Sequence, residues 1–125
     1  MKKAKILIVE SESVTAMSIA HYLELWGYDV CEYVSTGEDA LRVAERERPD
    51  LALLNIKLRG EMKGLELSTR LGKCFGIPVV FISGYTGCAV RKQAEEAGAA
   101  GYLAKPFDFA LLRSILEQAL FQKTK

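Results

Sequence analysis

Short apolar runs alternate along this chain with longer stretches in which apolar residues recur at helical spacing. Each run holds about five residues and ends in polar residues, as expected for a strand that is covered on both faces. This alternation is typical of βαβ units around a parallel sheet. The pattern predicts an α/β fold in three layers, with a doubly wound, five-stranded parallel sheet. The predicted strands are Lys5 to Val9, Tyr28 to Val34, Asp50 to Asn55, Pro78 to Ile82 and Gly101 to Leu103.

Three of the intervening stretches carry a clear apolar stripe that a helix would turn toward the sheet. Gly27 and Gly98 follow two of them, where a left-handed cap ends a helix. Ser35 and Glu38 have capping-box spacing and predict the start of the second helix. The stripes are Ala16, Ile19, Ala20, Leu23 and Trp26; Val90, Ala94 and Ala97; and Leu112, Ile115, Leu116 and Ala119.

The third helix has the least support from the sequence. Leu65, Leu67 and Leu71 are its apolar residues, and Gly72 and Gly76 bracket a stretch that disfavours a helix. We therefore expect its boundaries to be displaced by as much as a turn.

Composition restricts the function classes. The chain has 125 residues, half of them hydrophobic, which fits one domain over residues 1–125. Its net charge of +1 gives no excess positive field for nucleic acid or anionic lipid. Three widely spaced cysteines form neither a disulfide framework nor a zinc motif, and no apolar run is long enough for a membrane span. We expect a cytoplasmic protein that contacts neither membrane nor nucleic acid directly.

Ligands of doubly wound sheets bind beyond the carboxyl ends of the strands, so the residues at those ends are the candidate site. Polar residues follow four of the five predicted strands. In chain order they are Glu10-Ser11-Glu12, Asn55, Ser83-Gly84 and Lys105-Pro106-Phe107.

Four segments together resemble the receiver domains of response regulators, over essentially the full length of the chain. The resemblance implies a flavodoxin-like fold with strand order 2-1-3-4-5 and a role in two-component phosphorelay signal transduction. Each segment is weakly specific alone, but their order and spacing are highly specific. The segments are Ile6-Leu7-Ile8-Val9-Glu10, Pro49 to Asn55, Ile82-Ser83-Gly84-Tyr85 and Gly101 to Phe107.

The resemblance assigns a role to five positions. In receivers, two adjacent acids hold Mg²⁺, an aspartate accepts the phosphoryl group, and a hydroxyl and a lysine bind the phosphoryl oxygens. Glu10 matches the first acid, whereas Ser11 replaces the second. Asn55 replaces the phosphoacceptor, and Ser83 and Lys105 match the phosphoryl contacts. Both departures remove a carboxylate, which marks the chain as a degenerate, or pseudo-receiver, variant.

These two losses predict a domain without phosphotransfer chemistry. The nitrogen lone pair of an asparagine amide is delocalised into the carbonyl group, so Asn55 cannot form a stable acyl phosphate. Mg²⁺ prefers anionic oxygens, and a site of Glu10, the Ser11 hydroxyl, an amide and the Lys57 backbone carbonyl should bind it weakly. We expect no enzyme activity and no cofactor beyond weakly bound Mg²⁺.

The remaining charges lead to a hypothesis. Glu10 and Lys105 can neutralise each other with Asn55 hydrogen-bonded between them, because opposite charges about 4 Å apart attract by roughly 4 kcal/mol at an effective dielectric of 20. Such a contact would lock one conformation. Glu12 is expected to act mainly through the helix dipole, with an inward turn toward the pocket as the alternative.

Three further residues have assigned or excluded roles. Tyr102 resembles the switch aromatic of receivers, with a half-buried sheet tyrosine as the equal alternative. Pro106 is a candidate for a cis peptide that would fix the aim of Lys105. His21 is expected to be a solvent-facing helix residue and not a phosphotransfer histidine.

Three functions remain in competition. The leading one is a degenerate receiver that contacts a protein, such as a histidine kinase or an output domain, with a possible homodimer through its fourth helix, fifth strand and fifth helix. The second is an ordinary phosphoaccepting receiver in which Asn55 is an engineered change, although Ser11 argues against it. The third is a flavodoxin-like flavin carrier with Ser11, Ser13 and Thr15 around a phosphate, which Glu10 would repel.

Overall fold

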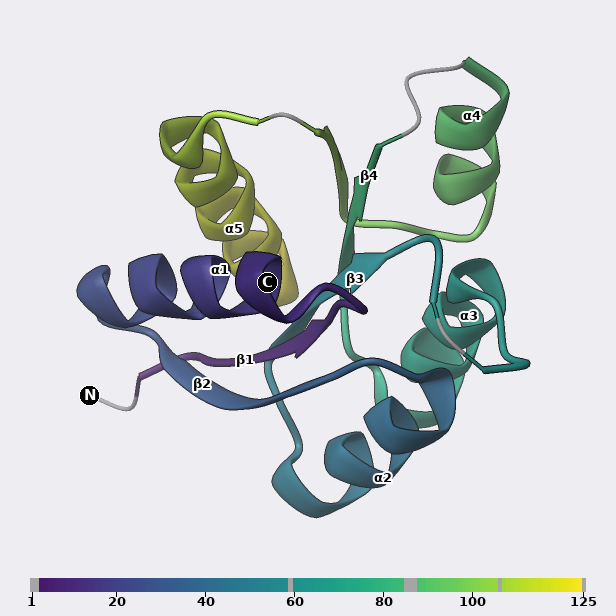
Figure 1. Ribbon diagram of the computed structural model, residues 1–125, viewed down its shortest axis with the longest axis horizontal. Helices are drawn as coiled ribbons and strands as arrows, with labels where there is room; N and C mark the ends of the chain where they lie inside the picture. Colours follow the sequence, from purple (N-terminus) through teal and green to yellow (C-terminus); the bar gives the residue numbers. More distant parts are fainter. Residues whose placement is uncertain (1–2, 59, 85–87, 106, 125) are drawn as a thin grey trace.

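The computed structural model is an α/β fold in which five strands form one parallel sheet (Figure 1). It describes residues 3–58, 60–84, 88–105 and 107–124, without the side chains of residues 88–90 and 122–124. The order β2-β1-β3-β4-β5 is the predicted one. The elements are β1 Lys5–Val9, α1 Ser13–Leu25, β2 Asp29–Val34, α2 Gly37–Glu47, β3 Leu51–Asn55, α3 Gly64–Phe75, β4 Val79–Ser83, α4 Cys88–Glu96, β5 Gly101–Ala104 and α5 Phe109–Thr124.

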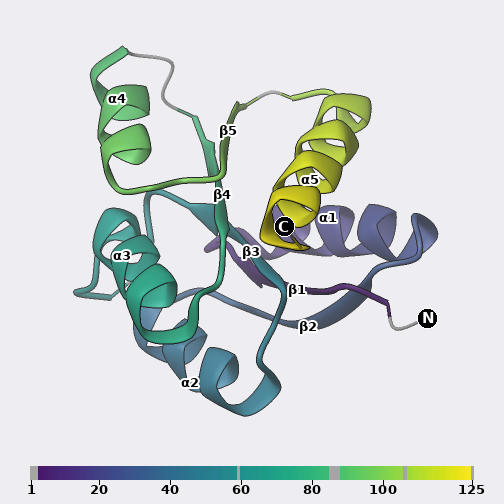
Figure 2. The ribbon, with the colours of Figure 1, turned by 180° about the vertical axis from the view of Figure 1, so that it is seen from behind.

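Helices cover both faces of the sheet, which gives the three layers that the sequence predicts (Figures 1 and 2). Successive strand residues point to opposite faces, so Leu7 and Val9 enter one core while Ile6 and Ile8 enter the other. The first core includes side chains of α2, α3 and α4, and the second includes side chains of α1 and α5. β1, β3 and β4 are therefore apolar on both faces, as parallel strands under two helical layers should be.

The ends of the helices confirm two predictions and correct one. Gly27 and Gly98 have φ angles of 90° and 85°, so both adopt the left-handed conformation. The cap of α2, however, is Thr36 and not Ser35: the Thr36 hydroxyl accepts a hydrogen bond from the Asp39 backbone N–H at 3.1 Å. This N-cap contact fixes the helix start one residue later than the capping-box spacing predicts.

The third helix is longer and more regular than its sequence suggests. It includes Gly72, which therefore does not bracket it, and ends at Gly76 with φ 65°. Leu67 and Leu71 are fully buried against the sheet, and this tertiary burial outweighs the low helix propensity of glycine. At its first residue, a Cβ on Gly64 would lie 2.6 Å from the carbonyl oxygen of Ile56, so the helix packs closely against the β3–α3 loop.

Candidate functional site

A polar concavity of about 380 Å³ lies at the carboxyl end of the sheet. Parallel register explains how residues far apart in sequence meet there: Asn55 pairs with Ile82, and Ser83 pairs with Ala104. The strands therefore end at the same edge of the sheet, and the residues that follow them lie at the concavity. The lining residues are Ser11, Glu12, Asn55, Lys57, Gly84 and Lys105.

Glu10 lies beneath this concavity and is 5% exposed. One carboxylate oxygen, Oε1, accepts the Asn55 amide Nδ2 at 2.8 Å and the Glu12 backbone N–H at 3.2 Å. The other, Oε2, accepts the Lys105 ammonium at 3.1 Å. Both oxygens of this buried carboxylate are therefore satisfied by groups of the chain itself.

Lys105 contacts two carboxylates of unequal strength. Its Nζ lies 3.1 Å from Glu10, whose side chain is 2% exposed, and 3.5 Å from Glu12, whose side chain is 69% exposed. Water screens the outer contact far more than the inner one. Glu10 is thus the main counter-ion of Lys105, and Glu12 adds a weak second one.

The amide of Asn55 is held in one orientation by two hydrogen bonds. Its Nδ2 donates to Glu10, while its Oδ1 accepts the backbone N–H of Lys57 at 3.0 Å. A flipped amide would set its oxygen against the Glu10 carboxylate and its NH₂ against the Lys57 N–H. The Glu10–Lys105 contact that the charge argument predicts is present in the structure. Asn55, however, does not bridge the two charges as expected: it bonds to Glu10 on one side and to the Lys57 N–H on the other.

These donors are a poor match for Mg²⁺, which favours anionic oxygens with free lone pairs and octahedral geometry. The buried carboxylate is already paired with an ammonium group, and Ser11 offers a neutral hydroxyl. Within the described residues, no group of three or more histidine, cysteine, aspartate and glutamate side chains is arranged to hold a metal ion. The residues present do not fit the magnesium site that receivers use.

The remaining candidate residues from the sequence do not take part in the Glu10–Asn55–Lys105 contacts described above. Ser83 is 1% exposed, and its carbonyl oxygen accepts the Lys105 backbone N–H at 2.7 Å. Ser11 is half-buried at the pocket wall, and His21 is exposed on α1 as expected. Pro106, the candidate cis proline, lies outside the described residues.

A family comparison decides the class of the chain. The model of the response regulator receiver domain family matches residues 6–117. The chain belongs to this family. The match spans β1 from Ile6 onward, the other four strands and the first half of α5, so the Glu10, Asn55, Ser83 and Lys105 positions all lie within it.

Relatives of this receiver include longer regulators. The transcriptional regulatory protein PdtaR of Mycobacterium tuberculosis is 28% identical over 116 residues, which are 93% of this chain and 56% of PdtaR. The phyllosphere-induced regulator PhyR of Methylorubrum extorquens is 35% identical over 118 residues, 94% of this chain and 43% of PhyR. This receiver spans about half the length of the curated relatives it matches.

Solved structures agree with the fold. The signal receiver domain of a modulated diguanylate cyclase from Desulfovibrio desulfuricans G20 has a TM-score of 0.90 and 34% identity, with 98% of both chains covered. A CheY-like receiver from Methanospirillum hungatei JF-1 has a TM-score of 0.89 and 30% identity, again with 98% of both chains covered. No helix in the described part of the chain is long and apolar enough to cross a membrane.

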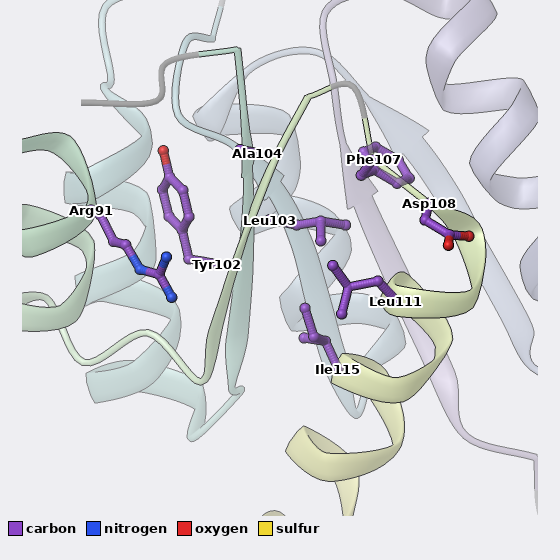
Figure 3. Close-up of a pocket in the computed structure, with 8 residues that line it drawn as sticks. All are labelled: Arg91, Tyr102, Leu103, Ala104, Phe107, Asp108, Leu111 and Ile115. Atoms are coloured by element: carbon purple, nitrogen blue, oxygen red, sulfur yellow. The ribbon is translucent and has the colours of Figure 1, made fainter. Parts of the chain in front are cut away.

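A second concavity, of about 410 Å³, lies between α4 and α5 on this receiver (Figure 3). Leu103, Leu111 and Ile115 form its apolar side, while Arg91 and Tyr102 lie toward α4. The Tyr102 ring is half-buried, and the Arg91 guanidinium lies 5.8 Å from its centroid in a cation–π contact. The position that resembles the switch aromatic is thus held beside α4.

Two contacts in the structure, Glu12 with Lys105 and Arg91 with Tyr102, were not the ones that the sequence favoured. The sequence placed Glu12 chiefly at the helix dipole, yet Glu12 also contacts Lys105. Arg91 received no role, because a lone arginine on a helix carries no signal until the fold brings it beside Tyr102. For the Glu12–Lys105 contact the sequence did offer a signal: Glu12 directly follows Ser11, which stands where receivers have their second acidic residue.

Proposed function

We propose that this receiver does not accept a phosphoryl group and acts through contacts with another protein. The observation that carries the proposal is the Asn55 side chain, which occupies the phosphoacceptor position and donates to the buried Glu10 carboxylate at 2.8 Å. An aspartate there would present a nucleophilic oxygen. Asn55 presents an amide whose two polar atoms are already engaged within the chain.

The same contacts argue for weak binding of Mg²⁺. A metal ion at Glu10 would compete with the Lys105 ammonium for Oε2 and would receive no second carboxylate from Ser11. Phosphoryl transfer needs a metal or an equivalent cation to neutralise the transferred group. Loss of the nucleophile and loss of the metal site thus support the same conclusion independently.

The paired pocket also supports a locked conformation. Lys105 is held by two carboxylates and Asn55 by two hydrogen bonds, so the pocket is satisfied without a ligand. A receiver in this state presents one form of its α4-β5-α5 surface, where the groove beside Tyr102 offers apolar area between Arg91 and Asp108. Its partner is an output domain or a histidine kinase, or a second copy through the same surface.

The test is incubation with Mg²⁺ and acetyl phosphate, followed by intact mass measurement, with beryllium fluoride and NMR as a second readout. The natural sequence should gain no covalent phosphoryl group and show no Mg²⁺-dependent shift. The variant that carries both Ser11→Asp and Asn55→Asp should respond to Mg²⁺ and take up phosphate. Single variants serve as matched controls, because each restores one carboxylate.

One result would overturn the proposal, and another would overturn the argument for weak Mg²⁺ binding. A phosphoryl group on the unmodified chain at Asn55 would remove its basis. Strong Mg²⁺ binding by the Asn55→Asp variant alone would show that the second acid is not needed and that the Glu10–Lys105 contact does not exclude the metal.

A further inference from the structure

A series of aromatic rings connects the segment after β5 with the C-terminal end of α1. Phe107 meets Phe109 edge to face, with 5.2 Å between the ring centroids. Phe109 stacks on Tyr22 at 4.0 Å, and Tyr22 lies 5.9 Å from Trp26. Stacked and edge-to-face pairs are the arrangements that aromatic rings favour. We call Phe107, Phe109, Tyr22 and Trp26 the aromatic row.

The aromatic row joins α1 to α5 on one face of the sheet (Figures 1 and 2). Trp26, Phe107 and Phe109 pack against the second core. The guanidinium of Arg113 in α5 lies 5.6 Å from the centroid of the Trp26 ring, so this end of the row is also held by a cation–π contact. Tyr22 remains 37% exposed, so its stacking on Phe109 bridges the two helices instead of filling the core.

The row begins two residues after Lys105. The Lys105 backbone N–H donates to the Ser83 carbonyl oxygen at 2.7 Å, which fixes the end of β5. The next backbone anchor is Asp108, whose carboxylate accepts the Ala110 N–H at 2.9 Å where α5 begins. A lysine side chain loses much rotamer freedom in an ion pair, so the pair forms readily only from a backbone that is already held in place. The Phe107 ring lies between the two anchors and supplies such support.

The other end of α1 meets Lys105 directly. Glu12, the N-cap residue of α1, lies 3.5 Å from the Lys105 ammonium and donates its backbone N–H to the Glu10 carboxylate at 3.2 Å. The helix is therefore attached to the Lys105 segment by charge at one end and through the Tyr22 ring near the other. A shift of α1 relative to that segment would change both contacts together.

We propose that the aromatic row is a positioning device for Lys105: it holds the segment after β5 against α1 and thereby keeps the ammonium group on Glu10. The proposal deepens the locked pocket of the proposed function and rests on the Glu10–Lys105 contact, but not on whether Asn55 accepts a phosphoryl group. Phe107 also lines the groove between α4 and α5 (Figure 3). A partner seated in that groove would touch the ring that is closest to Lys105 in sequence.

The test measures how fast Lys105 reacts with an amine-specific acetylating reagent, followed by peptide mass spectrometry. Tyr22→Leu removes the stack on Phe109 and should raise the rate at Lys105 by about fivefold, because the ammonium group is then released more often from its carboxylates. Phe109→Leu should have the same effect. Lys5 is the internal reference, because it is also paired with a carboxylate and its side chain is 34% exposed. The rate at Lys5 should not change.

The matched control variant is Phe75→Leu. Phe75 is a partly buried ring that packs against the first core, on the other face of the sheet, and it takes no part in the aromatic row. Phe75→Leu should therefore leave the rate at Lys105 at its natural value.

The reverse measurement uses Trp26, the only tryptophan of the chain. Coupling between two sites is reciprocal, so Lys105→Met should raise the quenching of Trp26 fluorescence by acrylamide by about twofold. Lys73→Met, at an exposed position on α3, should leave the quenching unchanged.

Three results would contradict the proposal. The first is an unchanged rate at Lys105 in both Tyr22→Leu and Phe109→Leu. The second is an equal rise at Lys105 and Lys5, which would mean that the variants loosen the whole protein. The third is unchanged quenching of Trp26 in Lys105→Met. None of them affects the mass measurement with acetyl phosphate, so this proposal and the proposed function can fail separately.

Discussion

Replacing Asn55 by aspartate should destabilise the protein when no metal is present. The change converts a donor that lies 2.8 Å from the Glu10 carboxylate into a second carboxylate oxygen. Two unit charges at that distance repel by about 6 kcal/mol at an effective dielectric of 20. Rotation of the new side chain and the ammonium of Lys105 will relieve most of this repulsion, and we expect a net loss of about 2 kcal/mol in the free energy of unfolding.

Urea unfolding at pH 7 with a chelator measures this loss, with the natural sequence as reference. The destabilisation should shrink at acidic pH, where one of the two carboxyl groups takes up a proton and the repulsion disappears. Added Mg²⁺ should restore stability more in the variant that also carries Ser11→Asp than in Asn55→Asp alone. A free energy within about 0.5 kcal/mol of the natural value would refute the reasoning, because it would mean that the Asn55 amide does not stabilise Glu10.

Three other changes test neighbouring features. Lys105→Met should lower the free energy of unfolding in urea by about 2 kcal/mol, because it leaves the buried Glu10 carboxylate without its cation. Adding Glu10→Gln should recover part of that loss, and no recovery would disprove the pairing. Gly64→Ala should lower the unfolding free energy by about 2 kcal/mol, because the new Cβ would meet the backbone oxygen of Ile56 at 2.6 Å, and an unchanged melting temperature would contradict this clash. Burial raises the pKa of the Cys31 thiol from 9.0 to about 11. Between these pH values only the unfolded thiol ionises, so the free energy of unfolding should fall as the pH rises from about 9 to about 11. The same fall in the Cys31→Ala variant would show that other groups cause it.

Most of the fold follows from the local pattern of the sequence. All five strands were predicted to within one residue at each end. For β1, β3 and β4 the reason is that strands buried on both faces leave a continuous apolar signal. The third helix was harder, since Gly72 lowers its propensity and only the burial of Leu67 and Leu71 in the folded state compensates. Thr36 replaced Ser35 as a cap because both residue types can accept the N-cap hydrogen bond.

The site was predictable as a set of residues but only partly as a set of contacts. Strand ends identified Glu10, Asn55 and Lys105, and charge pairing predicted that they would meet. The second contact of Lys105, with Glu12, was foreseen only as the alternative in which Glu12 turns toward the pocket, because the path of the chain after β1 decides between the two. The Arg91–Tyr102 contact joins two elements through tertiary packing and was invisible in the sequence.

The Glu10–Lys105 ion pair joins positions 95 residues apart, because Glu10 follows the first strand and Lys105 follows the last. Contacts of such separation form late, since the chain between them must be ordered first. During synthesis the Glu10 carboxylate therefore cannot pair with Lys105 until the last strand has been made. Any transient detachment of β5 and α5 from the sheet would remove Lys105 and expose that carboxylate to water, so the integrity of the pocket depends on the docking of these two elements.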